Sequence, residues 1–123
     1  MARTVLIVDD HAEFRSAARA MLELGGFTVV GEAADGDDAV TECARVHPDV
    51  VLLDVMLPGE DGFAVARRLV GADDSPMVVL TSTRDAAGFG RRLAATPARG
   101  FVAKHELSAA AVTRILDGGA AAP

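Results

Sequence analysis

Five polar side chains of this sequence stand at the ends of short apolar runs. Three of them are carboxylates, one is a hydroxyl group and one is the ammonium group of the only lysine in the chain. A carboxylate can act as a nucleophile and form an acyl phosphate, while an ammonium and a hydroxyl group beside it can stabilise the charge of a phosphoryl group. The five residues are Asp9, Asp10, Asp54, Thr81 and Lys104.

The stretch from Pro48 to Gly62 contains the best candidate for the nucleophile. Four apolar residues, 50–53, precede Asp54, and the turn signals Pro58-Gly59 and Asp61-Gly62 follow it. A short apolar run bounded by turn signals predicts a strand that is buried on both faces of a parallel sheet. Open parallel sheets bind their ligands at the carboxyl ends of the strands. Asp54 therefore stands where such a fold carries out its chemistry.

The three carboxylates are expected to converge at one edge of the sheet. Like charges at such short range cannot all remain ionised without help, so either one is protonated or a cation neutralises them. An oxygen site of two or three carboxylates suits Mg²⁺. Lys104 is either required for the same chemistry or left by chance among eleven arginines, and composition does not decide between these readings.

The apolar pattern predicts five units of a strand followed by a helix. Strand starts recur about once per βα unit, which favours one α/β domain with a parallel sheet. We expect a flavodoxin-like three-layer sandwich with the strand order 2-1-3-4-5. Gly88 and Gly90 should make the fourth helix marginal, because each costs a helix interior about 1 kcal/mol relative to alanine. The expected strands are 4–8, 27–33, 50–53, 77–80 and 100–103, and the expected helices are 11–24, 36–46, a helix capped by Asp61, 84–96 and 108–117.

Length, charge and cysteine content exclude several classes of protein. The chain has 123 residues, half of them hydrophobic, and no apolar stretch long enough to span a membrane. The apolar run 4–8 is stopped by acids too early for a signal peptide. The single cysteine, Cys43, fits a reducing cytoplasm, and the net charge of -6 argues against nucleic-acid binding by this chain.

With these residues in place, the chain resembles a response-regulator receiver domain of bacterial two-component signalling. The resemblance covers residues 3 to about 117, so we assign 1–117 to the receiver and 118–123 to a flexible tail or the start of a linker. The stretch 104–108, Lys-His-Glu-Leu-Ser, is similar to the subgroup that carries a C-terminal helix-turn-helix output domain. The segments that carry the resemblance are Val5 to His11, Asp54 with Met56-Leu57-Pro58 and Asp61-Gly62, Leu80-Thr81-Ser82, and Gly100 to Lys104.

The resemblance implies a role for each site residue. Asp54 matches the residue that a histidine kinase phosphorylates, and Lys104 matches the lysine that pairs with the phosphoryl group. Asp9 and Asp10 match the acidic pair that holds Mg²⁺ together with Asp54 and the backbone carbonyl of Met56. In this family the receiver catalyses only its own phosphorylation and dephosphorylation.

The resemblance also implies a conformational switch. Thr81 matches the hydroxyl that moves toward the phosphoryl group, and Phe101 matches the aromatic residue whose rotamer reports activation. The altered face, around 84–96, 100–103 and 108–117, would contact an output domain or a partner protein, in some cases a second copy of the chain. The expected output is the control of transcription.

Two other functions and two departures stay open. A receiver that works only as an interaction module would need no phosphorylation, and an aspartyl-phosphate phosphatase would want a second acid where Met56 stands. His11 is either a metal ligand or a residue of the first helical turn beside the site. His105 follows the lysine where many family members have proline, and Pro97 lies near the expected end of the fourth helix.

Overall fold

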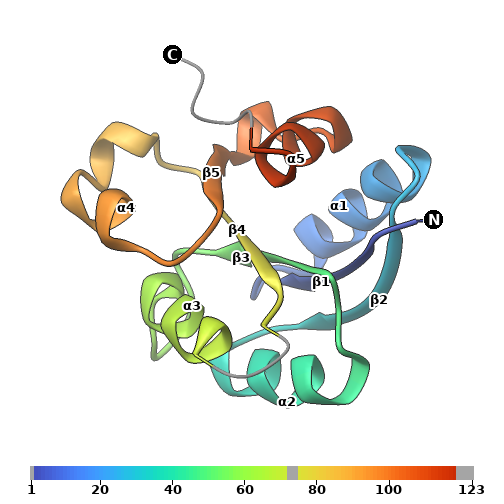
Figure 1. Ribbon diagram of the computed structural model, residues 1–123, viewed down its shortest axis with the longest axis horizontal. Coiled ribbons are helices and arrows are strands. Elements are labelled where there is room, and N and C mark those ends of the chain that lie inside the picture. Colours follow the sequence, from blue (N-terminus) through green and yellow to red (C-terminus); the bar gives the residue numbers. More distant parts are fainter. Residues whose placement is uncertain (1, 72–74, 119–123) are drawn as a thin grey trace.

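The strands form one parallel sheet in the order β2-β1-β3-β4-β5, as predicted (Figure 1). A computed structural model describes residues 2–71 and 75–118 of the chain. The predicted tail lies outside these residues except for Gly118, as does part of the loop before β4. The strands are β1 (Thr4–Val8), β2 (Thr28–Ala33), β3 (Val50–Asp54), β4 (Met77–Ser82) and β5 (Gly100–Ala103).

Helices cover both faces of the sheet. Helices α1 and α5 pack on one face, and α2, α3 and α4 pack on the other (Figure 1). None of the described helices combines the length and hydropathy that a membrane-spanning segment needs. The helices are α1 (Ala12–Leu24), α2 (Gly36–Val46), α3 (Gly62–Val70), α4 (Arg91–Ala95) and α5 (Ala109–Leu116), with 3₁₀ turns η1 (Ala86–Gly88) and η2 (Lys104–Glu106).

The central strand β3 shows why its sequence is continuously apolar. Successive side chains of a strand point to opposite faces of the sheet. Val50 and Leu52 pack with α1 and α5, whereas Val51 and Leu53 pack with the helices of the other face. All four are buried. A strand covered on both sides has no solvent-facing position for a polar residue until the sheet reaches its edge.

Strands β3 and β4 extend further than predicted. Asp54 was expected just after β3 but is its last residue, and it pairs in register with Thr81 of β4. The backbone N–H of Val55 then donates to the carbonyl of Thr81 at 2.9 Å. Backbone pairing therefore continues past the apolar run and fixes the backbone of Asp54.

The first turn of α3 is held tightly against the end of β3. Asp61 caps the helix as predicted, because its side chain accepts a hydrogen bond from the N–H of Ala64 at 2.9 Å. The N–H of Gly62 donates to the carbonyl of Val55 at 2.7 Å. A Cβ at Gly62 would lie 2.4 Å from the carbonyl oxygen of Asp54, so only glycine fits this contact.

The helix predicted over 84–96 is broken in two. A 3₁₀ turn and the short α4 are separated by Gly90, whose φ of 50° favours glycine. The side chain of Phe89 is buried between the two pieces, and its ring centroid lies 5.6 Å from those of Phe63 and Phe101. We call Phe63, Phe89 and Phe101 the aromatic row. The break lets the chain turn Phe89 into the core.

Candidate functional site

Three strand ends bring two carboxylates and one ammonium group together. Asp9 follows β1, Asp54 ends β3 and Lys104 follows β5. The Lys104 Nζ donates to Asp9 Oδ2 at 2.5 Å and lies 3.4 Å from Asp54 Oδ2. Since β1 and β3 are neighbours in the sheet, the two carboxylates reach the same side chain. The lysine lies 95 residues along the chain from the first of them.

The Lys104 side chain is held from two directions. Its ammonium group lies 4.1 Å from the ring centroid of Phe14 in α1, a cation–π geometry. On its other side are the carboxylates, and only 13% of the side chain is exposed. Lys104 begins the 3₁₀ turn η2, in which the N–H of Leu107 donates to its carbonyl at 3.3 Å. The ammonium group is therefore a fixed positive charge.

Asp9 is held in its charged form. It is fully buried, and burial alone would raise its pKa. Hydrogen bonds from the Lys104 ammonium and from the backbone N–H of His11, at 2.8 Å, outweigh that effect, so the pKa of Asp9 lies below its ordinary value. Asp9 is thus a stable anion at neutral pH.

Asp54 ionises less readily than Asp9. Burial raises the pKa of Asp54 to about 6, and the negative charge of Asp9 adds to the rise. A hydrogen bond from the backbone N–H of Met56, at 3.1 Å, works against it. The ammonium group of Lys104 lies closer to Asp9 and so compensates Asp54 less. The site consequently has an excess of negative charge at neutral pH.

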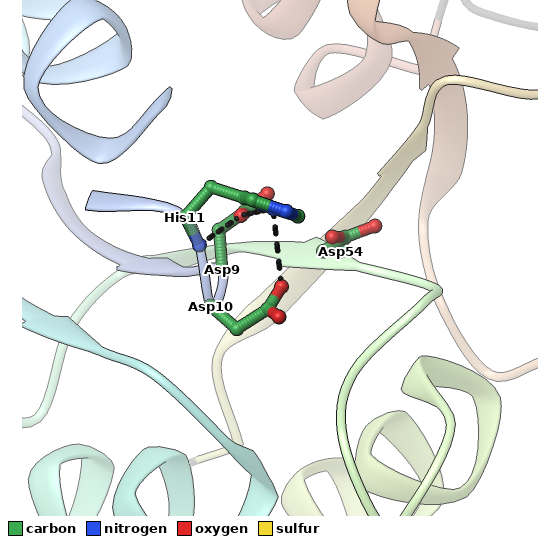
Figure 2. Close-up of side chains that lie close together, drawn as sticks. All are labelled: Asp9, Asp10, His11 and Asp54. Carbon is green, nitrogen blue, oxygen red and sulfur yellow. Dashed lines mark hydrogen bonds and ion pairs between the residues drawn. The ribbon is translucent and has the colours of Figure 1, made fainter. Parts of the chain in front are cut away.

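Asp10 and His11 complete an acidic cluster at this edge of the sheet (Figure 2). Asp9, Asp10, His11 and Asp54 each offer one ligand atom, and these atoms lie within 4.8 Å of one another. Asp10 and His11 are exposed, so the cluster opens to solvent on their side. The backbone of Met56 lies next to Asp54, whereas its side chain is half exposed and carries no acid.

Thr81 and Phe101 lie beside the cluster and not in it. The buried Thr81 hydroxyl donates to the carbonyl oxygen of Val102 in β5 at 2.7 Å. It is the cross-strand neighbour of Asp54 but is directed to β5 in this conformation. Phe101 is half-buried and contacts Phe89. The structure therefore brings Asp9, Asp10, Asp54 and Lys104 together and leaves these two residues adjacent.

A second layer of charged residues supports the backbone of Asp9, and we did not predict it. Arg15 donates through Nη1 to the carbonyl oxygen of Asp9 at 2.6 Å and through Nε to Glu32 at 2.9 Å. Arg19 donates to the other oxygen of Glu32 at 2.9 Å. Burial opposes ionisation of Glu32, but the two guanidinium groups outweigh it and lower its pKa. Residues 11, 15 and 19 are four apart, a helical spacing that could have signalled this stripe.

Comparisons with known proteins agree over nearly the whole chain. The family model described as "Response regulator receiver domain" matches residues 5–116. A protein of Bordetella pertussis that is named as the virulence-factor transcription regulator BvgA is 37% identical over 106 residues, covering 86% of this chain and 51% of that protein. The chain thus spans about half the length of the curated relatives it matches.

Solved structures give the same result. The signal receiver domain of a protein assigned as the response regulator NarL, from Mycobacterium tuberculosis, has a TM-score of 0.83 and 33% identity, with 98% of each chain covered. A CheY of Borrelia burgdorferi, solved in a complex with CheX, BeF3 and Mg²⁺, has a TM-score of 0.80 and 26% identity, covering 93% of this chain and 86% of that one.

Proposed function

The chain belongs to the family of response regulator receiver domains, and we propose that it works as a phosphorylation switch with Asp54 as the phosphoryl acceptor. The observation that carries the proposal is the contact of Lys104 with Asp9 and Asp54 across three strand ends. A buried carboxylate whose negative charge is only partly compensated attracts a cation and can act as a nucleophile toward an electrophile.

The residues of the cluster fit Mg²⁺. Carboxylate oxygens are the ligands that this ion prefers, and the excess negative charge around Asp54 calls for a cation. Asp9, Asp10 and Asp54 would hold the ion with the backbone carbonyl of Met56. When bound, Mg²⁺ would offset the negative charge that collects on the phosphoryl oxygens.

The phosphoryl donor in the proposal is the phosphohistidine of a sensor histidine kinase. One oxygen of Asp54 forms a bond to phosphorus while the bond from phosphorus to the imidazole nitrogen breaks. The nitrogen keeps that electron pair, and the product is an acyl phosphate on Asp54. Lys104, already 3.4 Å from this carboxylate, can pair with a phosphoryl oxygen. Hydrolysis ends the cycle: water attacks phosphorus, the bond from phosphorus to the Asp54 oxygen breaks, and inorganic phosphate and the free carboxylate are released. We assign no other chemistry to the chain.

The switch would use the neighbours of the cluster. The Thr81 hydroxyl, which now donates to Val102, would donate to the phosphoryl group instead. That movement would break the hydrogen bond to the carbonyl of Val102 in β5, next to Phe101. The face formed by α4, β5 and α5 would change as a result. A new charge beside the fixed Lys104 ammonium group and the Thr81 hydroxyl would shift the equilibrium between two conformations, as phosphorylation does generally.

We further infer that the altered face controls an output domain or partner, with transcription as the regulated process and dimerisation on phosphorylation as one route. Support comes from the relative named as the transcription regulator BvgA, of which this chain covers about half.

The test is labelling by acetyl phosphate with Mg²⁺, followed by intact-protein mass spectrometry. We expect one phosphoryl group on the wild type and on Asp38→Ala, a matched control on the exposed surface of α2, and none on Asp54→Ala. Release of the group by hydroxylamine would identify an acyl phosphate. An unlabelled wild type, as expected for a phosphorylation-independent interaction module, would overturn the proposal, and so would a labelled Asp54→Ala.

An aspartyl-phosphate phosphatase predicts a different result. Such an enzyme would turn over a small phosphate ester many times, whereas a receiver would not. Met56 stands two residues after Asp54, where that class of enzyme uses an acid, and its side chain is an exposed thioether. Steady release of phosphate from p-nitrophenyl phosphate, lost in Asp54→Ala, would favour the phosphatase.

A further inference from the structure

The imidazole ring of His11 lies at the site without serving the helix it precedes. His11 is the N-cap residue of α1, but its side chain makes no capping hydrogen bond. Its backbone N–H donates to Asp9 Oδ1 at 2.8 Å, which fixes the residue beside that carboxylate. The ring therefore takes a position that helix formation does not require.

One ring nitrogen faces two carboxylates. His11 Nδ1 lies 3.1 Å from Asp9 Oδ1 and 3.2 Å from Asp10 Oδ1. Figure 2 shows the ring beside these two carboxylates. Both contacts lie at ion-pair distances. With the ring proton on Nε2, Nδ1 has a lone pair that a metal ion between these oxygens can accept in place of these contacts. Lys104 occupies Asp9 Oδ2 on the other side, and Oδ1 is left facing the ring.

The spacing of the four side chains suits one metal ion. Ligand atoms at about 2.1 Å from a common ion lie about 3 to 4.2 Å from one another. The ligand atoms of Asp9, Asp10, His11 and Asp54 lie within 4.8 Å of one another, only slightly wider than that range. Within residues 2–71 and 75–118, this is the one group of three or more such side chains with converging ligand atoms.

We propose that His11 Nδ1 is a further ligand in this cluster, so that the site also binds divalent ions that favour nitrogen, such as Co²⁺ and Zn²⁺. Mg²⁺ prefers oxygen ligands and would not use the imidazole, whereas Co²⁺ and Zn²⁺ accept it readily. The inference rests on the proposed function, because it assumes that the three carboxylates hold a cation. The new element is that a single residue, His11, decides whether the site also binds ions that favour nitrogen.

The experiment compares two ions on three proteins. Affinities for Mg²⁺ and Co²⁺ are measured by isothermal titration calorimetry on the wild type, His11→Gln and His105→Gln, an exposed control in the turn η2. We expect His11→Gln to weaken Co²⁺ binding about tenfold or more and to change Mg²⁺ binding less than about twofold. The visible absorption of bound Co²⁺ should change in the same variant, and His105→Gln should match the wild type.

Each outcome separates this inference from the proposed function. Unchanged Co²⁺ affinity and absorption in His11→Gln would overturn the role of the ring, while Mg²⁺-dependent labelling of Asp54 would still stand. An equal loss for both ions would also overturn it, since the ring would then support the carboxylates and not select the metal. If neither ion binds the wild type, the inference and the proposed metal site both fall.

Discussion

At the scale of single residues, the buried position of Asp54 lowers the stability of the folded protein when its carboxylate is ionised. Its carboxylate is buried beside Asp9, and its pKa is raised to about 6. The residue types were readable from the sequence, because Asp54 ends a strand and Asp9 and Lys104 each directly follow one. The directions of individual hydrogen bonds could not be read from the sequence. That Thr81 donates to Val102 and not toward Asp54 depends on the spacing of β4 and β5, which no local pattern encodes.

Replacing Asp54 with asparagine should stabilise the metal-free protein at neutral pH. An acid with a pKa of 3.8 in the unfolded chain and about 6 in the folded one disfavours folding by about 3 kcal/mol once it is ionised. The folded state holds more protons between these pH values, so the wild type loses stability as pH rises from about 4 to 6. We expect Asp54→Asn to gain about 1 to 3 kcal/mol above pH 6 and little near pH 4.

Urea unfolding followed by circular dichroism, in EDTA at several pH values, would measure this difference. Asp10→Asn is the matched control, because the same change is made on an exposed carboxylate of the cluster. A less stable Asp54→Asn at pH 7.5 would contradict the raised pKa.

At the scale of elements, continuous apolar runs predicted the strands well. Glycines marked the helix whose prediction was wrong. The runs 4–8 and 100–103 are the strands as the structure has them. The break in the predicted helix 84–96 was not foreseen, although Gly88 and Gly90 had indicated weakness. It depends on Phe89 packing between Phe63 and Phe101, a contact between residues far apart in the chain. The spacing of Arg15 and Arg19 was visible in the sequence, but their shared partner could not be predicted for the same reason, since Glu32 lies on β2.

The contact of Gly62 with the end of β3 should tolerate no side chain. In Gly62→Ala the new Cβ would meet the carbonyl oxygen of Asp54 at 2.4 Å, and backbone cannot move aside cheaply. We expect a loss of about 2 kcal/mol or more in the free energy of unfolding. Gly71→Ala, at the other end of α3 with an ordinary φ of -74°, is the control. Equal melting temperatures for the two variants would contradict the expectation.

The segment around α4 should open more readily than α1. The helix has five residues, none of them buried, whereas α1 has thirteen and buries Ala18 and Leu22. Short helices with little packing unfold locally at low cost. Amide hydrogen exchange of the unphosphorylated protein should therefore be at least about tenfold faster in α4 than in the middle of α1. Equal protection of both helices would show that α4 is not marginal.

At the scale of the whole molecule, one sheet separates two apolar layers. Each layer is built from alternate residues of the same strands, so we expect the two layers to unfold as one cooperative unit. The alternation of strands and helices predicted a parallel sheet with helices on both faces. The predicted order 2-1-3-4-5, with the second strand at an edge, is confirmed. The matched region is about half the length of a relative such as BvgA.

Removing side chains from either layer should weaken the same transition. Leu52 and Leu53 are adjacent in β3, both buried, and face opposite layers. Leu52→Ala and Leu53→Ala should each lower the free energy of unfolding by about 2 to 5 kcal/mol. Thermal unfolding followed by far-ultraviolet circular dichroism should show one transition in both variants. A second transition in either would mean that the layers unfold separately.

The aromatic row is a suitable place for a fluorescent reporter. The chain contains neither tryptophan nor tyrosine, so it is almost dark in conventional fluorescence. Phe101 is half-buried at the end of the row, in contact with Phe89. The indole introduced by Phe101→Trp would be the only tryptophan of the molecule. The wavelength of its emission maximum would distinguish a ring packed on Phe89 from one exposed to water.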